Sequence, residues 1–187
     1  MTHPGNTASR YSRGAIVFHW VIAALIVLNF AAAWISEDLP KEQHQQVMLN
    51  HKAIGMLILG LTVLRIVWRL THRPPPLSET LKTWEVALAK VVHGLFYVLM
   101  IAIPFAGWAM SSAFSGGQPV GFFGLFAIPG LPFQADKALA GVFHEVHELG
   151  ATLMLVLLAL HVAAVIKHAV IDRDGTMQRM LPWGRTA

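Results

Sequence analysis

Residues 147–161 read HELGATLMLVLLALH, an apolar segment with a histidine at each end. A histidine inside a membrane-spanning segment is costly and requires a partner or a function. Fourteen residues separate His147 from His161, and at about 100° per residue their side chains differ by only ~40° around a helix axis. Along that axis they lie about 21 Å apart. A helix here therefore presents two imidazoles to one interior at two heights.

The composition of the whole chain is typical of a membrane protein. Of its 187 residues, 55% are hydrophobic and 13% are charged, and the mean hydropathy is +0.55, whereas soluble domains are about 25% charged. Four apolar stretches are long enough to cross ~30 Å of hydrocarbon as helices. We therefore expect residues 1–187 to form a single all-α domain, a bundle of four transmembrane helices. The expected spans are 14–36, 50–70, 87–111 and 143–169.

The basic residues fall unevenly on the two sides of this bundle. With the N-terminus inside, only Lys41, Lys52 and Lys137 of the 14 Lys and Arg residues lie on the opposite side. The positive-inside rule then places both termini in the cytoplasm, and we attribute the basic charge to topology and not to nucleic-acid binding. The first apolar run is too long for a cleaved signal peptide. Residues 112–142, rich in Gly, Pro and Phe, are expected to form a long outside loop.

The histidines carry most of the information about chemistry. The chain has ten of them and no cysteine, which excludes disulfides, thiolate metal sites, iron–sulfur clusters and covalent haem attachment. His19 lies near the inside end of its span, at the level of His161, and His51 opens its span at the level of His147. Two imidazoles that face each other across a helical bundle can occupy both axial positions of a haem iron. The sequence thus predicts two stacked haem sites.

Several neighbouring residues leave alternatives open. Gly55 and Gly150 each lie about one helical turn after a histidine of the outer pair and leave room for a porphyrin edge. His93 lies at the depth of the inner pair, so it is either a rival ligand or a hydrogen-bonding partner of a haem propionate or a quinone. His144 rivals His147 but is turned about 100° from the face of the inner histidine. Surface positions are expected for His44, His72 and His168.

Five segments together resemble the bacterial cytochrome b561 family over about residues 10 to 182. They are RYSRGAIVFHW, NHKAIG, VVHGLFYVLMIAIPFAGW, HELGATLMLVLLALH and DGTMQRMLP. The resemblance implies a four-helix protein of the bacterial inner membrane with two non-covalent haem b groups. It also implies that His19 and His161 bind the inner haem and that His51 and His147 bind the outer one.

The resemblance further implies an electron-transfer function. Family members exchange electrons with ubiquinone, and a superoxide:ubiquinone oxidoreductase activity is assigned within the family. In that scheme superoxide is oxidised on the outside and quinone is reduced near the inner haem. Lys52, beside the expected ligand His51, would supply positive charge that steers superoxide. For the quinone we favour Arg13 and His93, within a group at the inner level that also contains Ser12, Trp20 and Lys82.

Two other functions fit the same sequence. The bundle is also compatible with an anchor subunit that carries electrons between a docked dehydrogenase or hydrogenase and quinone. A histidine-based metal or proton carrier without haem is the second alternative. Such carriers generally have carboxylates inside the membrane, and the spans of this chain hold almost none.

Overall fold

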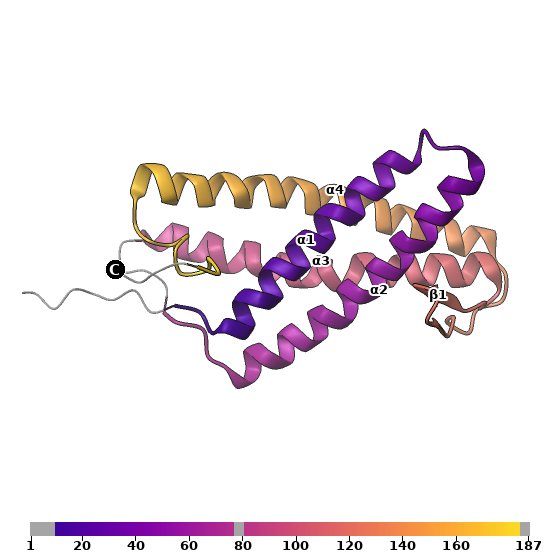
Figure 1. Cartoon of the computed structure of the whole chain (residues 1–187), viewed down its shortest axis with the longest axis horizontal. Coiled ribbons are helices and arrows are strands. Elements are labelled where there is room, and N and C mark those ends of the chain that lie inside the picture. Colours follow the sequence, from indigo (N-terminus) through magenta and orange to yellow (C-terminus); the bar gives the residue numbers. More distant parts are fainter. Residues whose placement is uncertain (1–9, 77–80, 184–187) are drawn as a thin grey trace, which may run out of the picture.

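The structure is a computed structural model that describes residues 10–76 and 81–183. It contains four long helices, each apolar enough to span a membrane, which confirms the expected all-α architecture (Figure 1). A π-helical turn extends the last helix. The helical elements are α1 (Arg13–Ser36), α2 (Lys41–Thr71), α3 (Thr83–Ser115), α4 (Lys137–Ile166) and the turn η1 (Lys167–Asp172).

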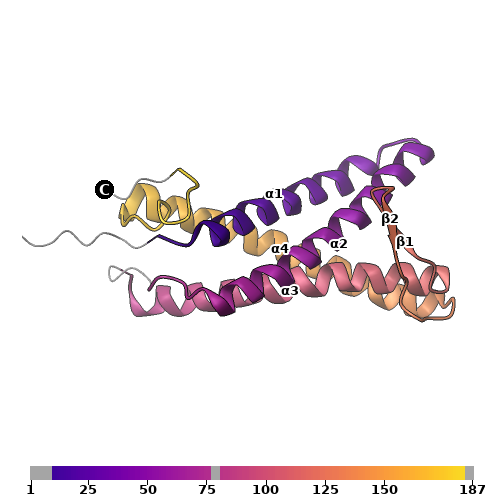
Figure 2. The same cartoon turned by 60° about the horizontal axis from the view of Figure 1, so that its bottom comes forward.

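The helices form two pairs that are joined along their middle. Helix α1 packs along α2, α3 packs along α4, and contacts between α2 and α3 connect the pairs (Figures 1 and 2). The turn between α1 and α2 and the connection between α3 and α4 lie at one end, which we call the hairpin end. The start of α1 and the chain that follows η1 lie at the opposite end, which we call the termini end.

The connection between α3 and α4 is shorter than expected and contains a small β-hairpin. Strands β1 (Val120–Phe122) and β2 (Phe126–Ile128) pair in antiparallel fashion, and β1 lies against α2. Helix α3 ends at Gly116, whose φ of 70° is the left-handed conformation that glycine adopts without strain. The expected loop over 112–142 is therefore wrong at both ends, because α3 continues to Ser115 and α4 begins at Lys137.

Helix α2 begins earlier than expected, at Lys41 instead of near residue 50. Its first two turns are polar, so the search for apolar runs missed them, although a helix can extend beyond the hydrocarbon layer. The expectation that His44 lies in a solvated loop is consequently wrong. His44 is half-buried in α2, and its Nδ1 donates a hydrogen bond to the Ser36 carbonyl at 2.8 Å.

A cluster of buried apolar side chains lies around the middle of the four helices. The cluster contains Ile22, Ile58, Leu99, Met100, Met154 and Leu157. Every helix contributes at least one of them. In α4, Met154 and Leu157 lie between His147 and His161 in sequence. This apolar layer therefore separates the two levels at which the histidines were expected.

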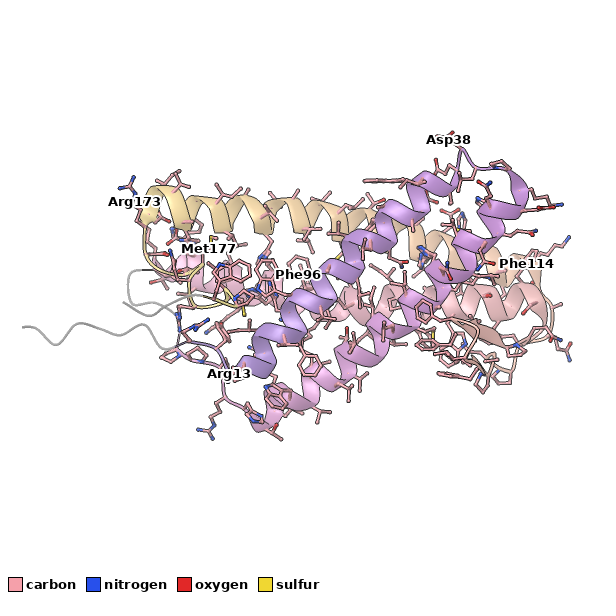
Figure 3. The ribbon with its side chains drawn as sticks, in the orientation of Figure 1. Arg13, Asp38, Phe96, Phe114, Arg173 and Met177 are labelled. Carbon is pink, nitrogen blue, oxygen red and sulfur yellow. The ribbon has the colours of Figure 1, made fainter. Side chains whose placement is uncertain are left out.

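The segment after η1 folds back onto the start of α1. The Trp20 indole N–H donates to the Met180 carbonyl at 2.8 Å, and the Tyr11 backbone N–H donates to the Arg179 carbonyl at 3.4 Å. Buried Arg179 in turn donates to the Pro76 carbonyl. Figure 3 shows Met177 of this segment and Arg13 of α1 at the same end of the bundle. These bonds connect the two ends of the described chain.

Gly150 allows α4 to approach α3 closely, and this can be tested. A Cβ atom at Gly150 would lie 2.9 Å from Ile103 Cγ1, whereas one at Gly60 would meet nothing within 4 Å. Gly150→Ala should therefore cost about 1–3 kcal/mol through overpacking, while the matched control Gly60→Ala gains helix propensity without a clash. Thermal unfolding of the detergent-purified variants measures the difference. Equal stability of the two variants would contradict the close contact.

Candidate functional site

The two histidines expected at the outer level face each other near the hairpin end. The ring centroids of His51 and His147 lie 6.1 Å apart with an interplanar angle of 68°. His147 Nδ1 donates to the Ile103 carbonyl at 2.8 Å, and His51 Nδ1 donates to the Asn29 carbonyl at 3.3 Å. A carbonyl only accepts, so the proton of each ring is on Nδ1 and the lone pair is on Nε2. Both rings thus have a free Nε2 and a fixed orientation.

Three histidines meet at the inner level. The His161 ring has its centroid 6.4 Å from that of His19, with an interplanar angle of 65°, and 5.8 Å from that of His93. Phe96, labelled in Figure 3, lies 5.5 Å from the His161 ring and edge-on to it. The inner level therefore has the same facing pair as the outer level, with a third imidazole on α3 beside it.

The spacing of both pairs fits two imidazoles that bind one metal ion from opposite sides. A metal–imidazole bond of about 2.0 Å and a ring radius of ~1.1 Å place two such centroids ~6.2 Å apart. The observed distances of 6.1 and 6.4 Å bracket that value. No hydrogen bond joins the two rings of either pair, although all four residues lie in the described chain. The donor set and its geometry therefore fit bis-histidine haem.

The arrangement of the helices favours His19 over His93 as the partner of His161 across a flat macrocycle. His93 is on α3, which packs closely along α4, whereas His19 is on α1, which does not pack along α4 in the described chain. His51 likewise reaches His147 from a helix, α2, that does not pack along α4. A porphyrin between two imidazoles requires ligands on helices that are not packed together, and both of these pairs meet that condition.

The expected outer-site residues other than histidine have contacts of their own. Lys52 Nζ donates to the Ser111 hydroxyl at 3.1 Å. Gly150 faces Ile103, so it has a packing reason to be small, and the nearest atom to a Cβ at Gly55 would be Pro104 Cβ at 3.9 Å. That either glycine contacts a porphyrin stays a prediction. His144 is largely exposed and pairs with Glu148 at 3.7 Å.

Sequence reasoning missed some residues that shape the outer level. A Cβ at Gly107 would lie 3.1 Å from the His147 ring, so this glycine of α3 makes space for the imidazole. A glycine within the third expected span was a signal in the sequence that a bulky group packs against it. The carbonyl partners of the two rings left no such signal, because every residue has a carbonyl and only the packing of the helices selects one.

The residues favoured for the quinone are not all brought together. Arg13 is exposed at the start of α1, whereas His93 lies beside His161 deeper in the bundle. The Ser12 hydroxyl accepts from the Trp68 indole at 3.1 Å, and Trp20 donates to the chain after η1. These two polar groups are thus already engaged within the protein.

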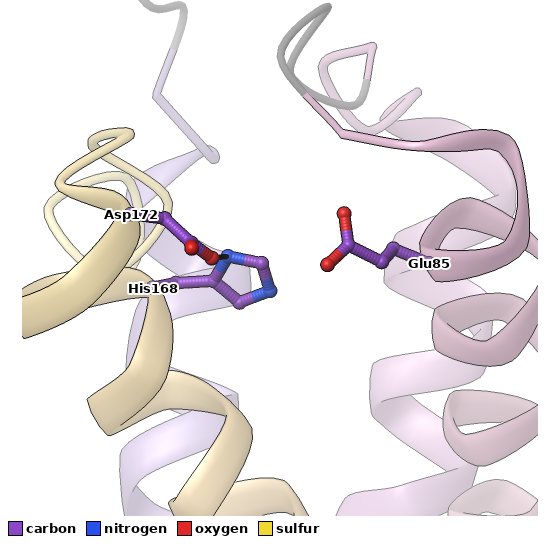
Figure 4. Close-up of side chains that lie close together, drawn as sticks. All are labelled: Glu85, His168 and Asp172. Carbon is purple, nitrogen blue, oxygen red and sulfur yellow. Dashed lines mark ion pairs between the residues drawn. The ribbon is translucent and has the colours of Figure 1, made fainter.

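An ionic cluster joins α3 to the end of α4 at the termini end. Figure 4 shows Glu85 across from His168 and Asp172, and His168 Nδ1 lies 2.9 Å from Asp172. Lys167 Nζ lies 3.0 Å from Glu85 and 2.6 Å from Asp172, so one ammonium group contacts both carboxylates. The cluster therefore connects α3 to the end of α4. The expected surface position of His168 is wrong, because its side chain is only 15% exposed.

Comparison with known proteins agrees with this geometry. The sequence model of the prokaryotic cytochrome b561 family matches residues 10–183. The chain belongs to this family. It is 30% identical to "Cytochrome b561 homolog 2" of Escherichia coli, covering 94% of this chain and 93% of that protein. It is 29% identical to "Probable superoxide oxidase CybB" of Yersinia pestis, covering 92% and 96%.

Family membership establishes the general class of the protein. Members of the prokaryotic cytochrome b561 family are multi-pass membrane proteins of electron transport, and the family implies a b-type haem. The imidazole pairs have the donor atoms and spacing that non-covalent haem binding needs in a cysteine-free chain. This argues against the alternative of a metal or proton carrier without haem.

Asp174 provides a pH-dependent anchor for the chain after η1. Burial raises the pKa of Asp174, but hydrogen bonds from the Thr176 backbone N–H and from His168 outweigh it and bring the pKa below the ordinary 3.8. A lowered pKa stabilises the folded state above pH 3.8, and the stabilisation is lost as the pH falls through the folded value. Below that pH, residues 173–183 should exchange amide hydrogen faster, after correction for intrinsic rates.

Two variants isolate this effect. Asp174→Asn should show the faster exchange already at neutral pH, whereas the exposed Asp38→Asn, at the hairpin end (Figure 3), should exchange like the wild type. If Asp174→Asn protects residues 173–183 as well as the wild type does at neutral pH, the anchoring role is wrong.

Proposed function

We propose that this protein carries two haem b groups and passes electrons across the membrane from superoxide to ubiquinone. The observation that carries the proposal is the near-identical geometry of two imidazole pairs, one at each level of the bundle. Their α4 members lie about 21 Å apart along the axis. A protein with one haem would need only one of these pairs. Two pairs with the same spacing therefore support two haem sites.

Each pair has a defined task in this proposal. His51 and His147 would hold the haem nearer the hairpin end, and His19 and His161 the haem nearer the termini end. Haem supplies an iron that accepts and releases one electron at a time. The Ile103 and Asn29 carbonyls hold the outer imidazoles in the tautomer that leaves Nε2 free, and such hydrogen bonds also raise the basicity of a ligand.

The distribution of charge supports a direction. The hairpin end would face outward, because the termini end carries most of the Lys and Arg residues. Both termini are then cytoplasmic. Lys52, next to His51, places an ammonium group where an incoming superoxide anion would lose its electron and leave as dioxygen. The name of the Yersinia pestis relative supports superoxide as the donor.

The third imidazole at the inner level supports quinone reduction there. Ubiquinone takes up two electrons and two protons, so two superoxide ions reduce one quinone. His93 lies beside His161 without being needed as an axial ligand, and it can donate a hydrogen bond to a quinone carbonyl. Arg13, exposed at the start of α1, is the second candidate for the headgroup.

Removal of one imidazole from each pair tests the ligand assignment. His161→Ala should lose the inner haem and keep the outer one, and His51→Ala should do the reverse. A pyridine haemochrome assay counts the haem, and redox titration identifies which one remains. His44→Ala is the matched control, because His44 lies on the same helix as His51 but bonds only to Ser36. Two full haem equivalents in either ligand variant would contradict the assignment.

The reaction itself is tested with the purified holoprotein. Without other electron acceptors present, superoxide should reduce the haem iron, which is followed by the haem absorbance spectrum. Added ubiquinone should then reoxidise the haem. His93→Phe should keep the haem content and haem reduction by superoxide but slow reoxidation about ten-fold or more, because the quinone loses a proton-donating partner. If superoxide leaves the spectrum unchanged while a co-purifying dehydrogenase reduces it, the protein is instead an anchor subunit.

A further inference from the structure

A cavity of about 410 Å³ opens at the hairpin end between α3 and α4. Figure 3 shows Phe114, one of its lining residues, at this end of the bundle. Its wall is formed by Lys52, Met110, Ser111, Phe114, Lys137, Ala140, Gly141 and His144. Neither His51 nor His147 lines it, so the cavity is distinct from the outer imidazole pair. It lies close to that pair, since Lys52 follows His51 and His144 is one turn from His147.

The charged groups of this cavity are all basic. Lys52 and Lys137 are two of the three lysines expected outside, and no carboxylate lines the wall. Lys52 Nζ is oriented by the neutral hydroxyl of Ser111. Lys137 has no ion pair or hydrogen-bond partner for its ammonium group within residues 10–76 and 81–183. The cavity therefore has uncompensated positive charge.

Two carboxylates close to the cavity in sequence have contacts of their own. Asp136 caps α4, and its carboxylate accepts from the backbone N–H groups of Ala138 and Leu139. Glu148 pairs with His144 at 3.7 Å and is itself largely exposed. A ligand held in the cavity would thus lie against two lysines and no carboxylate.

The size and lining of the cavity select the kind of anion. A water molecule occupies about 30 Å³, so a diatomic anion would fill only a small part of this space. Cavities of ~300–1,000 Å³ with apolar walls and a few polar groups are typical of small organic ligands. Met110, Phe114 and Ala140 supply the apolar wall here. A carboxylate with an apolar body would pair with the lysines and contact the apolar wall.

We infer that this cavity binds an organic monocarboxylate, with Lys52 and Lys137 holding the carboxylate and Phe114 and Met110 contacting the apolar body. The inference goes beyond the proposed electron transfer and does not depend on superoxide being the donor. A carboxylate at these lysines has a second possible source, the propionates of a haem held by the neighbouring histidines. The experiment therefore separates a dissolved carboxylate from a propionate.

Equilibrium dialysis of radiolabelled benzoate against the haem-loaded, detergent-purified protein tests the inference. At an ionic strength of about 0.01 M, charge interactions are little screened. Benzoate should bind saturably at one site per chain, and Lys137→Gln should weaken it about five-fold, the effect of one exposed ion pair. Lys41→Gln, which removes an exposed lysine outside the cavity at the same end, should bind as the wild type does. Uncharged benzamide should compete poorly.

Several results would overturn the inference. Absence of saturable benzoate binding, equal affinity of Lys137→Gln and Lys41→Gln, or equally tight benzamide binding would each overturn the inference. Haem transfer to apomyoglobin provides the second measurement. No benzoate binding together with faster haem loss from Lys137→Gln would assign the lysines to the propionates and would also overturn it. Because the readout is binding, a failure here leaves the proposed redox reaction untouched.

Discussion

An imidazole inside a membrane needs a partner for each of its polar nitrogens, and α4 carries two such rings on one face. The rest of the bundle is arranged to meet this requirement. Helices α2 and α1 supply the opposing rings, and backbone carbonyls engage Nδ1 of both outer histidines. The ring centroids of each pair then lie at a distance that fits two imidazoles on one metal ion. Between the two levels, buried apolar side chains from all four helices exclude water from the interior.

The two ends of the bundle are stabilised by different interactions. At the termini end, Lys167 links α3 to η1 through two carboxylates, and the last described residues bond to α1. At the hairpin end, β1 lies against α2, and Lys52 reaches from α2 to Ser111 on α3. The outer level is therefore bordered by a short ordered connection and a basic cavity. The inner level is bordered by an ionic network and a folded-back chain, and it alone has a third imidazole.

The basic cavity and the outer imidazole pair lie close together and have one lysine in common. Few positive residues occur at the hairpin end, and two of its three lysines, Lys52 and Lys137, line the cavity. Lys52 contributes to both places, because it follows His51 in sequence and lines the cavity with its ammonium group. Under both proposals the anion, a small reductant or a larger organic acid, would be held close to the outer level.

The sequence by itself determined the four spans, the heights of the histidines and the shared face of His147 and His161, because helix periodicity and hydrocarbon thickness act locally along the chain. The sequence did not predict the helix ends where a helix continues in polar sequence, as in the first turns of α2. Hydropathy indicates which residues lie in the hydrocarbon layer, and a helix can extend beyond that layer. Only the tertiary structure decided that both His19 and His93 lie beside His161. It also selected the Asn29 and Ile103 carbonyls that fix the outer tautomers, and it placed His168 between Asp172 and Asp174. Each of these depends on which helices pack closely and which stay apart, a property of side chains distant in sequence.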